Sequence, residues 1–276
     1  MHAHFFPERV FASLWKWFEA RWWGISYKGT PDELAEKLRS FGVKRFVTYN
    51  YAHKPGMAAR LNEWTASFCE EHPEAIPFAT VHPDDTGNAA MVDDLFDRGF
   101  AGVKIQPLVS DFYPCDPRMD EVYGRIVERG RILTAHAGTG PAANQYVGAD
   151  NFEPVMDRFP EMKVIVAHMG AFEYDRFFDI ARRCPNVFLD TSVNFIDQDV
   201  MRRLIEERRF PPLEIPSDIP AEVLLELQDR LLFGSDFPNI PYTYTDCIES
   251  ITSLGLGDEF EEAVFYGNAG RLLATL

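Results

Sequence analysis

Apolar residues recur along this chain in two alternating patterns. From residue 30 onward, stretches with apolar side chains at three- and four-residue spacing, typical of helices, alternate with short apolar runs. These runs are aliphatic or β-branched at consecutive positions, as in strands that are buried on both faces. Helices that alternate with such strands indicate βα units arranged around a parallel sheet.

The two patterns define the predicted elements. Helices are expected over Thr30–Phe41, Met57–Glu71, Asn88–Arg98, Arg118–Arg129, Phe152–Phe159, Tyr174–Arg183, Val200–Arg208, Ala221–Leu227 and Thr245–Leu254. Strands are expected over Val43–Tyr49, Ile76–Val81, Gly102–Ile105, Ile132–Ala135, Val164–Ala167, Val187–Leu189 and Leu231–Phe233. With a further strand at the amino terminus, the pattern predicts a closed (β/α)8 TIM barrel of the α/β class.

The length of 276 residues suits one complete barrel, so we expect residues 1–276 to form a single domain. The Pro-rich stretch Pro211–Pro220 is then an elaborated loop before the last strand. Only Met1 precedes His2, so the first strand is very short unless the chain is numbered from an internal start.

Composition and charge narrow the classes of partner. The net charge of −16 argues against nucleic acids and anionic membrane surfaces, and no apolar run reaches the length of a membrane span. Met1 leads directly into His2 without a secretory signal, and the four cysteines form no CxxC pair. Both features predict a cytoplasmic protein with reduced thiols. The aromatic stretch Leu14–Trp23 carries charges, which predicts a helix or lid on the barrel and leaves a homodimer interface as an alternative.

Candidate chemistry collects where the predicted strands end, which is the catalytic face of such barrels. In chain order the first polar residues after the strands are His2 and His4, Asn50 and Tyr51, His82, Lys104 and Gln106, His136, His168, Asp190 and Thr191, and Asp236. A single histidine in such a place is often a core residue whose hydrogen bonds are made within the protein, and Asp236 alone can cap a turn. The recurrence of histidines at one end of the sheet favours a shared site.

This set of residues predicts a metal site. His2 and His4 are two residues apart, so both side chains point to one face of a strand and can share one ion. With His136 and Asp236 they form a ligand set that suits one divalent ion, with zinc as the expected metal. Such an ion activates a water molecule, Asp236 can accept its proton, and His168 can polarise the substrate or carry a proton. We expect Gly138 to leave room above this site.

Several motifs resemble the amidohydrolase superfamily, and more closely its branch with aminocarboxymuconate-semialdehyde decarboxylase and γ-resorcylate decarboxylase. They read His2-Ala3-His4-Phe5-Phe6-Pro7, Gly102-Val103-Lys104-Ile105, Ala135-His136-Ala137-Gly138, Val166-Ala167-His168-Met169-Gly170, Phe233-Gly234-Ser235-Asp236-Phe237-Pro238 and Tyr266-Gly267-Asn268-Ala269-Gly270-Arg271-Leu272.

This resemblance implies a distorted TIM barrel with one divalent metal held by His2, His4, His136 and Asp236, and His168 as a catalytic histidine. It leaves two roles open for Lys104. A carboxylated Lys104 would bridge a second metal, which the flanking sequence disfavours, whereas an unmodified Lys104 would anchor a substrate carboxylate.

The leading functional hypothesis is a metal-dependent hydrolase that attacks a small amide, ester or lactone with an activated water. The alternative is a non-oxidative decarboxylase or hydratase that acts on a small unsaturated or aromatic carboxylic acid. In both cases the partner is a small molecule carrying a carboxylate, and Tyr51 at the end of the second strand is a candidate donor to it. Intact His2, His4 and His136 argue against a metal-free lactonase or a scaffold protein.

Overall fold

The computed structural model describes residues 1–207 and 219–276, and its described strands form one parallel sheet. Eight strands are hydrogen-bonded in the order in which they occur in the chain. Their bounds are β1 Ala3–His4, β2 Phe46–Tyr49, β3 Ala75–Thr80, β4 Gly102–Ile105, β5 Ile132–Ala135, β6 Lys163–Val166, β7 Val187–Asp190 and β8 Leu231–Leu232. This order confirms the predicted barrel topology, and the first strand is as short as the sequence indicates.

The sheet closes because the segment that follows β8 runs beside β1. Ala3 forms a parallel bridge with Phe237. The backbone N–H of His4 donates to the carbonyl of Phe237 at 2.7 Å, and the N–H of Asp236 donates to the carbonyl of His2 at 2.9 Å. Residues more than 230 positions apart in the sequence therefore become neighbours where the barrel closes.

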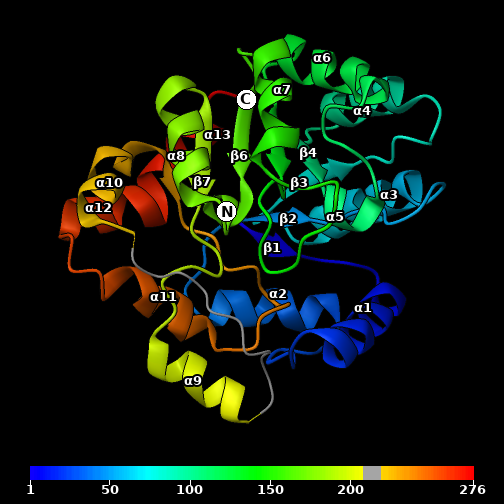
Figure 1. The fold of residues 1–276 in the computed structure, drawn as a ribbon. Helices are drawn as coiled ribbons and strands as arrows, with labels where there is room; N and C mark the ends of the chain where they lie inside the picture. The colour runs from blue at the N-terminus through cyan, green and yellow to red at the C-terminus, as the bar shows by residue number, and fades with distance from the viewer. Residues whose placement is uncertain (208–218) are drawn as a thin grey trace.

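Helices surround the strands, as Figure 1 shows. Their bounds are α1 Glu8–Arg21, α2 Pro31–Ser40, α3 Ala58–Glu71, α4 Asn88–Asp97, α5 Pro107–Ser110, α6 Asp120–Glu128, α7 Ala149–Arg158, α8 Tyr174–Arg183, α9 Gln198–Glu206, α10 Ala221–Glu226, α11 Tyr244–Thr252, α12 Asp258–Glu262 and α13 Asn268–Leu273. In Figure 1, α1, α2, α9 and α11 lie together at the bottom of the view. The predicted helix start at Thr30 is confirmed by a capping box, in which Thr30 and Glu33 exchange side-chain and backbone hydrogen bonds.

The core has an inner and an outer part. Inside the barrel, Val47 and Tyr49 of β2 pack with Phe78, Ile132 and Ile165 from the following strands. The outer faces of β3 to β8 pack against α4, α6, α7 and α8, and a further cluster joins α1, α2 and α3 to the ends of β1 and β2. Strands that are buried on both faces explain why their apolar residues are consecutive in the sequence.

The aromatic stretch near the amino terminus is helical, as predicted. Phe11, Trp15 and Phe18 form the buried side of α1, and Trp23 is buried just after it. The helix α7 begins at Ala149, three residues before the predicted start at Phe152, and α12 and α13 follow the last predicted helix. The end of the predicted helix Val200–Arg208 and most of the predicted loop Pro211–Pro220 lie outside the described residues.

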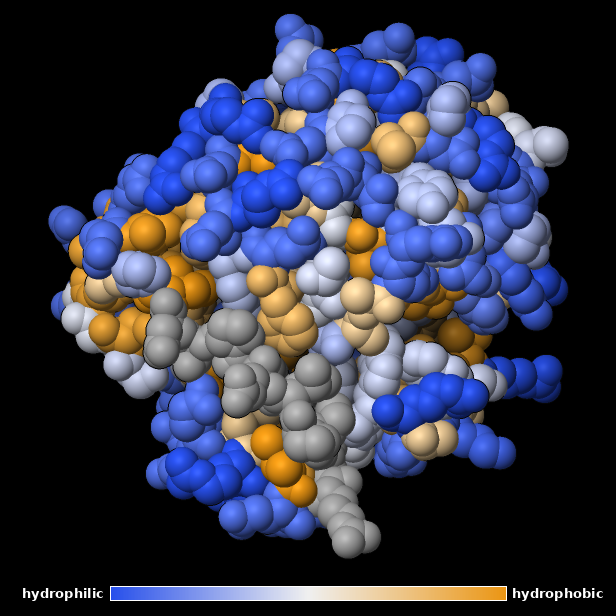
Figure 2. All heavy atoms as spheres, in the orientation of Figure 1, coloured by the Kyte–Doolittle hydropathy of each residue, from blue (hydrophilic) through white to orange (hydrophobic). Residues whose placement is uncertain are grey.

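Hydrophilic side chains cover most of the face drawn in Figure 2, and apolar residues gather over α10 and α12. Leu225 of α10 is among the large apolar side chains that remain exposed. Among the described helices, none has both the length and the apolar composition that crossing a bilayer requires.

Candidate metal centre

Three of the four predicted metal ligands converge on one point at the carboxyl end of the barrel. The Nε2 atoms of His2 and His4 are 3.1 Å apart. The Oδ1 atom of Asp236 lies 3.3 Å from Nε2 of His2 and 2.9 Å from Nε2 of His4. The three side chains are largely buried, with relative exposures of 2%, 5% and 8%. Three donor atoms that lie this close together form a candidate metal centre.

Hydrogen bonds on the far side of each imidazole ring aim the Nε2 atoms at this point. The Nδ1–H of His2 donates to Oδ2 of Asp190 at 2.9 Å, and the Nδ1–H of His4 donates to the carbonyl of Tyr49 at 3.2 Å. In these tautomers both Nε2 lone pairs are available to an ion. Because the two histidines are separated by one residue of β1, their side chains share the inner face of the barrel.

The backbone around Asp236 is shaped by close packing. Asp236 has φ 58°, a left-handed conformation that aspartate adopts more readily than most residues. Just before it, Gly234 leaves no space for a side chain, because a Cβ there would lie 2.7 Å from Oδ1 of Asp190 and 3.0 Å from Cβ of His2. The absence of a side chain at Gly234 thus allows the end of β8 to approach the first histidine.

Asp190 supports the candidate site, and the sequence indicated its position at the end of a strand without giving it a role. It ends β7, is fully buried, and accepts from His2, from the backbone N–H of His168 at 3.3 Å, and from the hydroxyl of Ser192. Burial alone would raise the pKa of Asp190, but the contact with His2 holds it well below its usual range. Its place among the polar residues at the strand ends was the signal that could have identified it.

His168 lies beside His2, outside the group of three converging ligands, and lines the same cavity. Its ring stacks on His2 with centroids 5.1 Å apart, and its Nδ1 lies 2.8 Å from Oγ of Ser192. The backbone of His168 is left-handed, with φ 56°. Strained conformations of this kind persist where the surroundings determine them, often at functional sites. His168 is thus held in a fixed position beside the metal ligands.

His136 is the predicted ligand that does not join the converging group. Its Nε2–H donates to the carbonyl of Gly140 at 3.0 Å, and its ring lies 4.9 Å from that of His168. Burial, followed by the nearby His168 and Lys104, lowers its pKa well below the usual range, so the ring is neutral, and with the proton on Nε2 the lone pair is on Nδ1. Its role as a ligand stays a prediction. The expectation for Gly138 was wrong, because a Cβ there would lie 2.3 Å from the backbone of Gly170, so this glycine serves close packing.

Lys104 lies beneath the site. Its side chain is completely buried, and Nζ has no hydrogen-bond partner among the described residues but sits 5.3 Å from the ring centroid of Tyr49. Burial lowers the pKa of Lys104 to about 8, against the opposing effect of Asp190 and Asp236. Lys104 does not line the cavity described below, and its contact with a substrate stays a prediction.

The site opens into a cavity of about 860 Å³. His2, His4, His136, His168 and Asp236 all line it, which brings the predicted catalytic and metal-binding residues to one place. Tyr51, the predicted substrate donor, also lines it and meets the ring of His4 edge-on at 5.6 Å. Much of the remaining wall is aromatic and comes from α1 and the segment after it, including Trp17, Trp22 and Trp23. A cavity with few polar groups at one end and apolar walls suits a small organic molecule.

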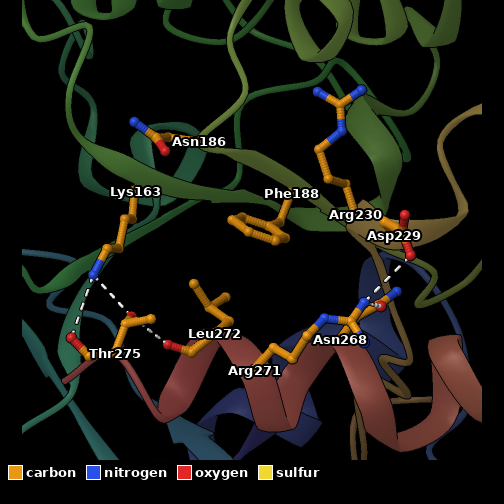
Figure 3. Close-up of a pocket in the computed structure, with 9 residues that line it drawn as sticks. All are labelled: Lys163, Asn186, Phe188, Asp229, Arg230, Asn268, Arg271, Leu272 and Thr275. Atoms are coloured by element: carbon orange, nitrogen blue, oxygen red, sulfur yellow. Dashed lines mark hydrogen bonds and ion pairs between the residues drawn. The ribbon is translucent and has the colours of Figure 1, made fainter.

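A second cavity, of about 480 Å³, lies at the opposite end of the barrel. Figure 3 shows Lys163, at the start of β6, directed toward Thr275, and Arg271 directed toward Asp229. The Nζ of Lys163 donates to the carbonyl of Gly130 at 3.0 Å and to Oγ1 of Thr275 at 2.8 Å. These contacts join the carboxyl-terminal segment to the barrel. Since the catalytic face of such barrels is the other end, we place the chemistry in the larger cavity.

Comparison with known proteins agrees with this architecture. The profile of the family described as amidohydrolase matches residues 1–275. No curated protein matches the chain. Among solved structures, an uncharacterised TIM-barrel protein from Bordetella bronchiseptica has 18% sequence identity and a TM-score of 0.72, with 99% of this chain and 98% of that chain covered.

Two further structures are enzymes by description. A probable 2-pyrone-4,6-dicarboxylic acid hydrolase from Acinetobacter baumannii, solved with citric acid bound, has 14% identity and a TM-score of 0.66, covering 99% of this chain and 97% of its own. A 5-carboxyvanillate decarboxylase from Novosphingobium aromaticivorans, solved with manganese, has 14% identity and a TM-score of 0.63, covering 99% and 95%. At these identities the likeness concerns the fold.

Proposed function

Since the chain belongs to the amidohydrolase family, we propose that it is a metal-dependent hydrolase of a small amide, ester or lactone that carries a carboxylate. The convergence of His2, His4 and Asp236 on one point, at the floor of a cavity large enough for a small organic molecule, is the observation that carries this proposal. A bound divalent ion would supply an activated water at neutral pH and polarise the carbonyl under attack.

The residues present fit a metal ion. Ligands about 2.0–2.2 Å from a tetrahedral zinc ion lie roughly 3.3–3.6 Å from one another. The three donor atoms here are 2.9, 3.1 and 3.3 Å apart, so a small outward movement would accommodate the ion. His2, His4 and Asp236 would hold the ion, with His136 as the fourth protein ligand. We propose zinc, and the manganese of the carboxyvanillate decarboxylase makes manganese the second metal to test.

The chain's own residues would divide the proton transfers between them. Burial opposes the charge of Asp236, and an ion shared with His2 and His4 would stabilise this side chain as a carboxylate. With Oδ1 directed at His2 and His4, the second oxygen of Asp236 would accept the proton of the attacking water. His168, held by Ser192, would donate to the oxygen of the substrate. Tyr51 would orient the substrate from the wall of the cavity.

Decarboxylation or hydration is the second candidate, and the wall of the cavity favours it. Phe6, Trp17, Tyr51 and Phe172 line the space beside the metal ligands. Such a wall suits a planar, unsaturated or aromatic acid. The 5-carboxyvanillate decarboxylase, which has a similar fold, is named for a substrate of this kind.

Metal content per chain tests the site itself. Protein purified without a histidine tag should contain about one zinc-like ion, and His136→Ala should lose most of it. About two ions would indicate a second metal bridged by a carboxylated Lys104. No metal under any growth condition would contradict the proposal.

Product analysis separates the two reactions. Small carboxylated lactones, esters and amides, and aromatic acids, are incubated with the metal-loaded protein in 18O-labelled water. Hydrolysis places the label in a new carboxylate, whereas decarboxylation releases CO2 without labelling the organic product. Release of CO2 alone would replace the first proposal by the second.

A further inference from the structure

Three positively charged side chains line the active-site cavity without a carboxylate partner in the part of the chain that the structure describes, whereas many arginines on the outside of the barrel form ion pairs. On the outer helices Arg98 pairs with Glu63 at 2.6 Å, and Arg176 pairs with Asp150 at 2.8 Å. Arg9, Lys54 and Arg60 line the cavity, and among the described residues no ion pair joins any of them to a carboxylate. Cations elsewhere, such as Lys16 and Lys44, also lack an ion pair among the described residues, but in a chain with 43 acidic and 27 basic residues the gathering of three of them at one cavity requires an explanation.

The three cations belong to neighbouring βα units. Arg9 lies in the first turn of α1, Lys54 in the connection from β2 to α3, and Arg60 in the first turn of α3. The two connections touch, because Phe6 and Tyr51 meet edge-to-face with centroids 5.1 Å apart. Since β1 and β2 are adjacent in the sheet, the cations line one side of the cavity.

This group of cations is separate from the metal ligands. Arg9, Lys54 and Arg60 are exposed, whereas His2, His4 and Asp236 are buried, so the cations mark the solvent side of the cavity and the ligands mark its floor.

One face of α1 lines the space between floor and rim. Val10, Leu14, Trp17 and Phe18 on this face are apolar, with the three- and four-residue spacing of a helix. Apart from Asp236, the carboxylate that lines the cavity is Asp111, so cations exceed anions there.

We propose that Arg9, Lys54 and Arg60 bind a second carboxylate of the substrate. The substrate then has an apolar body, with an acidic or acyl group at the metal ligands and a carboxylate at the cationic side, and it is a dianion where the group at the metal is also a carboxylate. This inference rests on the proposed function, because it takes the metal ligands as the place of reaction. Arginine recognises carboxylates through paired hydrogen bonds, and a cationic cavity in an acidic protein also concentrates anions locally.

A pair of probes that differ in one carboxylate tests the proposal. Phenylacetate and 1,4-phenylenediacetate are titrated into the metal-loaded full chain, and binding is followed by the fluorescence of Trp17, Trp22 and Trp23 in the cavity wall. The diacid should bind roughly tenfold more tightly at low salt, and added NaCl should reduce this preference. The double variant R9Q/R60Q should reduce the preference to about twofold or less and leave the affinity for phenylacetate within about twofold.

Arg176→Gln is the matched control, because it removes an exposed arginine from an outer helix and should leave both affinities unchanged. Equal affinities of the unmodified protein for the two acids, binding of neither acid at millimolar concentration, or a preference that survives in R9Q/R60Q would each overturn the proposal. Failure of the proposed function is recognised separately, by the absence of metal or turnover, because the ratio of the two affinities is measured without turnover.

Discussion

Lys104 offers the sharpest test of how this site affects the stability of the fold. Its ammonium is completely buried without a hydrogen-bond partner among the described residues. Burial lowers its pKa from 10.5 to about 8. A pKa difference of one corresponds to 1.36 kcal/mol. Holding the charged form in the folded state therefore costs about 3.4 kcal/mol below pH 8. We therefore expect Lys104→Met, which keeps the shape and removes the charge, to raise the free energy of unfolding by about 3 kcal/mol at pH 7.

The pH dependence gives this prediction a signature. Unfolded Lys104 keeps its proton up to pH 10.5, whereas the folded residue releases it near pH 8. Between these values the unfolded state binds more protons, so the stability of the unmodified protein rises with pH. The difference in free energy of unfolding between the variant and the unmodified protein should therefore be largest below pH 8, decrease from pH 8 to 10.5 and disappear above that. We propose that the charge of Lys104 serves the site and that its cost is tolerated for this reason, so the variant should lose activity.

The assay is urea unfolding in EDTA at intervals from pH 7 to 10, followed by tryptophan fluorescence. Lys44→Met is the control, because Lys44 is exposed and its replacement should leave the free energy of unfolding within about 0.5 kcal/mol. A Lys104→Met protein that is less stable than the unmodified chain at pH 7, or a stability difference that does not change with pH, would refute the reasoning.

Three further predictions concern the support of the site. Asp190→Asn replaces the charged acceptor that orients His2 by a neutral amide, so metal affinity should fall about 10- to 100-fold in a titration against a chelating dye, with the fold retained. Gly234→Ala places a Cβ 3.0 Å from that of His2 and closer still to Asp190, so it should lower the free energy of unfolding by about 1–3 kcal/mol and weaken metal binding. Replacing Trp22 and Trp23 with Ala should alter turnover and leave the metal content unchanged, because both line the cavity and neither belongs to the group of converging ligands.

Each of these predictions has a contrary result. Full metal affinity in Asp190→Asn would show that the orientation of His2 does not depend on this carboxylate. Unchanged stability of Gly234→Ala would mean that the end of β8 can move aside. For the tryptophans, loss of a dimer in place of altered turnover would assign the aromatic stretch to an interface between chains, and sedimentation would report it.

Much of the barrel was predictable because local patterns determine its elements. The runs at Gly102–Ile105 and Ile132–Ala135 coincide with β4 and β5. The short β1 could be located by its polar residues. The other predicted strands are each followed by polar residues, so His2 and His4 indicated the end of a further strand. Boundaries were less accurate: β2 begins at Phe46, three residues after the predicted start, because Val43 is apolar but lies outside the sheet.

The sequence by itself determined the alternation of strands and helices and the end of the sheet at which His2, His4 and Asp236 lie. Strand periodicity is local, and the carboxyl ends of parallel strands meet at one edge, so these features need no knowledge of packing. Only the tertiary structure decided that Asp190 orients His2, since the two residues are 188 positions apart and meet through closure of the barrel.

The same holds for Lys104 and for the cations of the cavity. A lysine in an apolar run can face a substrate or the barrel interior, and only the packing of Tyr49 and its neighbours encloses it. Arg9, Lys54 and Arg60 look like ordinary surface residues in the sequence. They become a group because β1 and β2 are adjacent and because the folded chain places no carboxylate against them among the described residues. The register of distant strands and the pairing of charges are properties of the assembled fold, which no local pattern encodes.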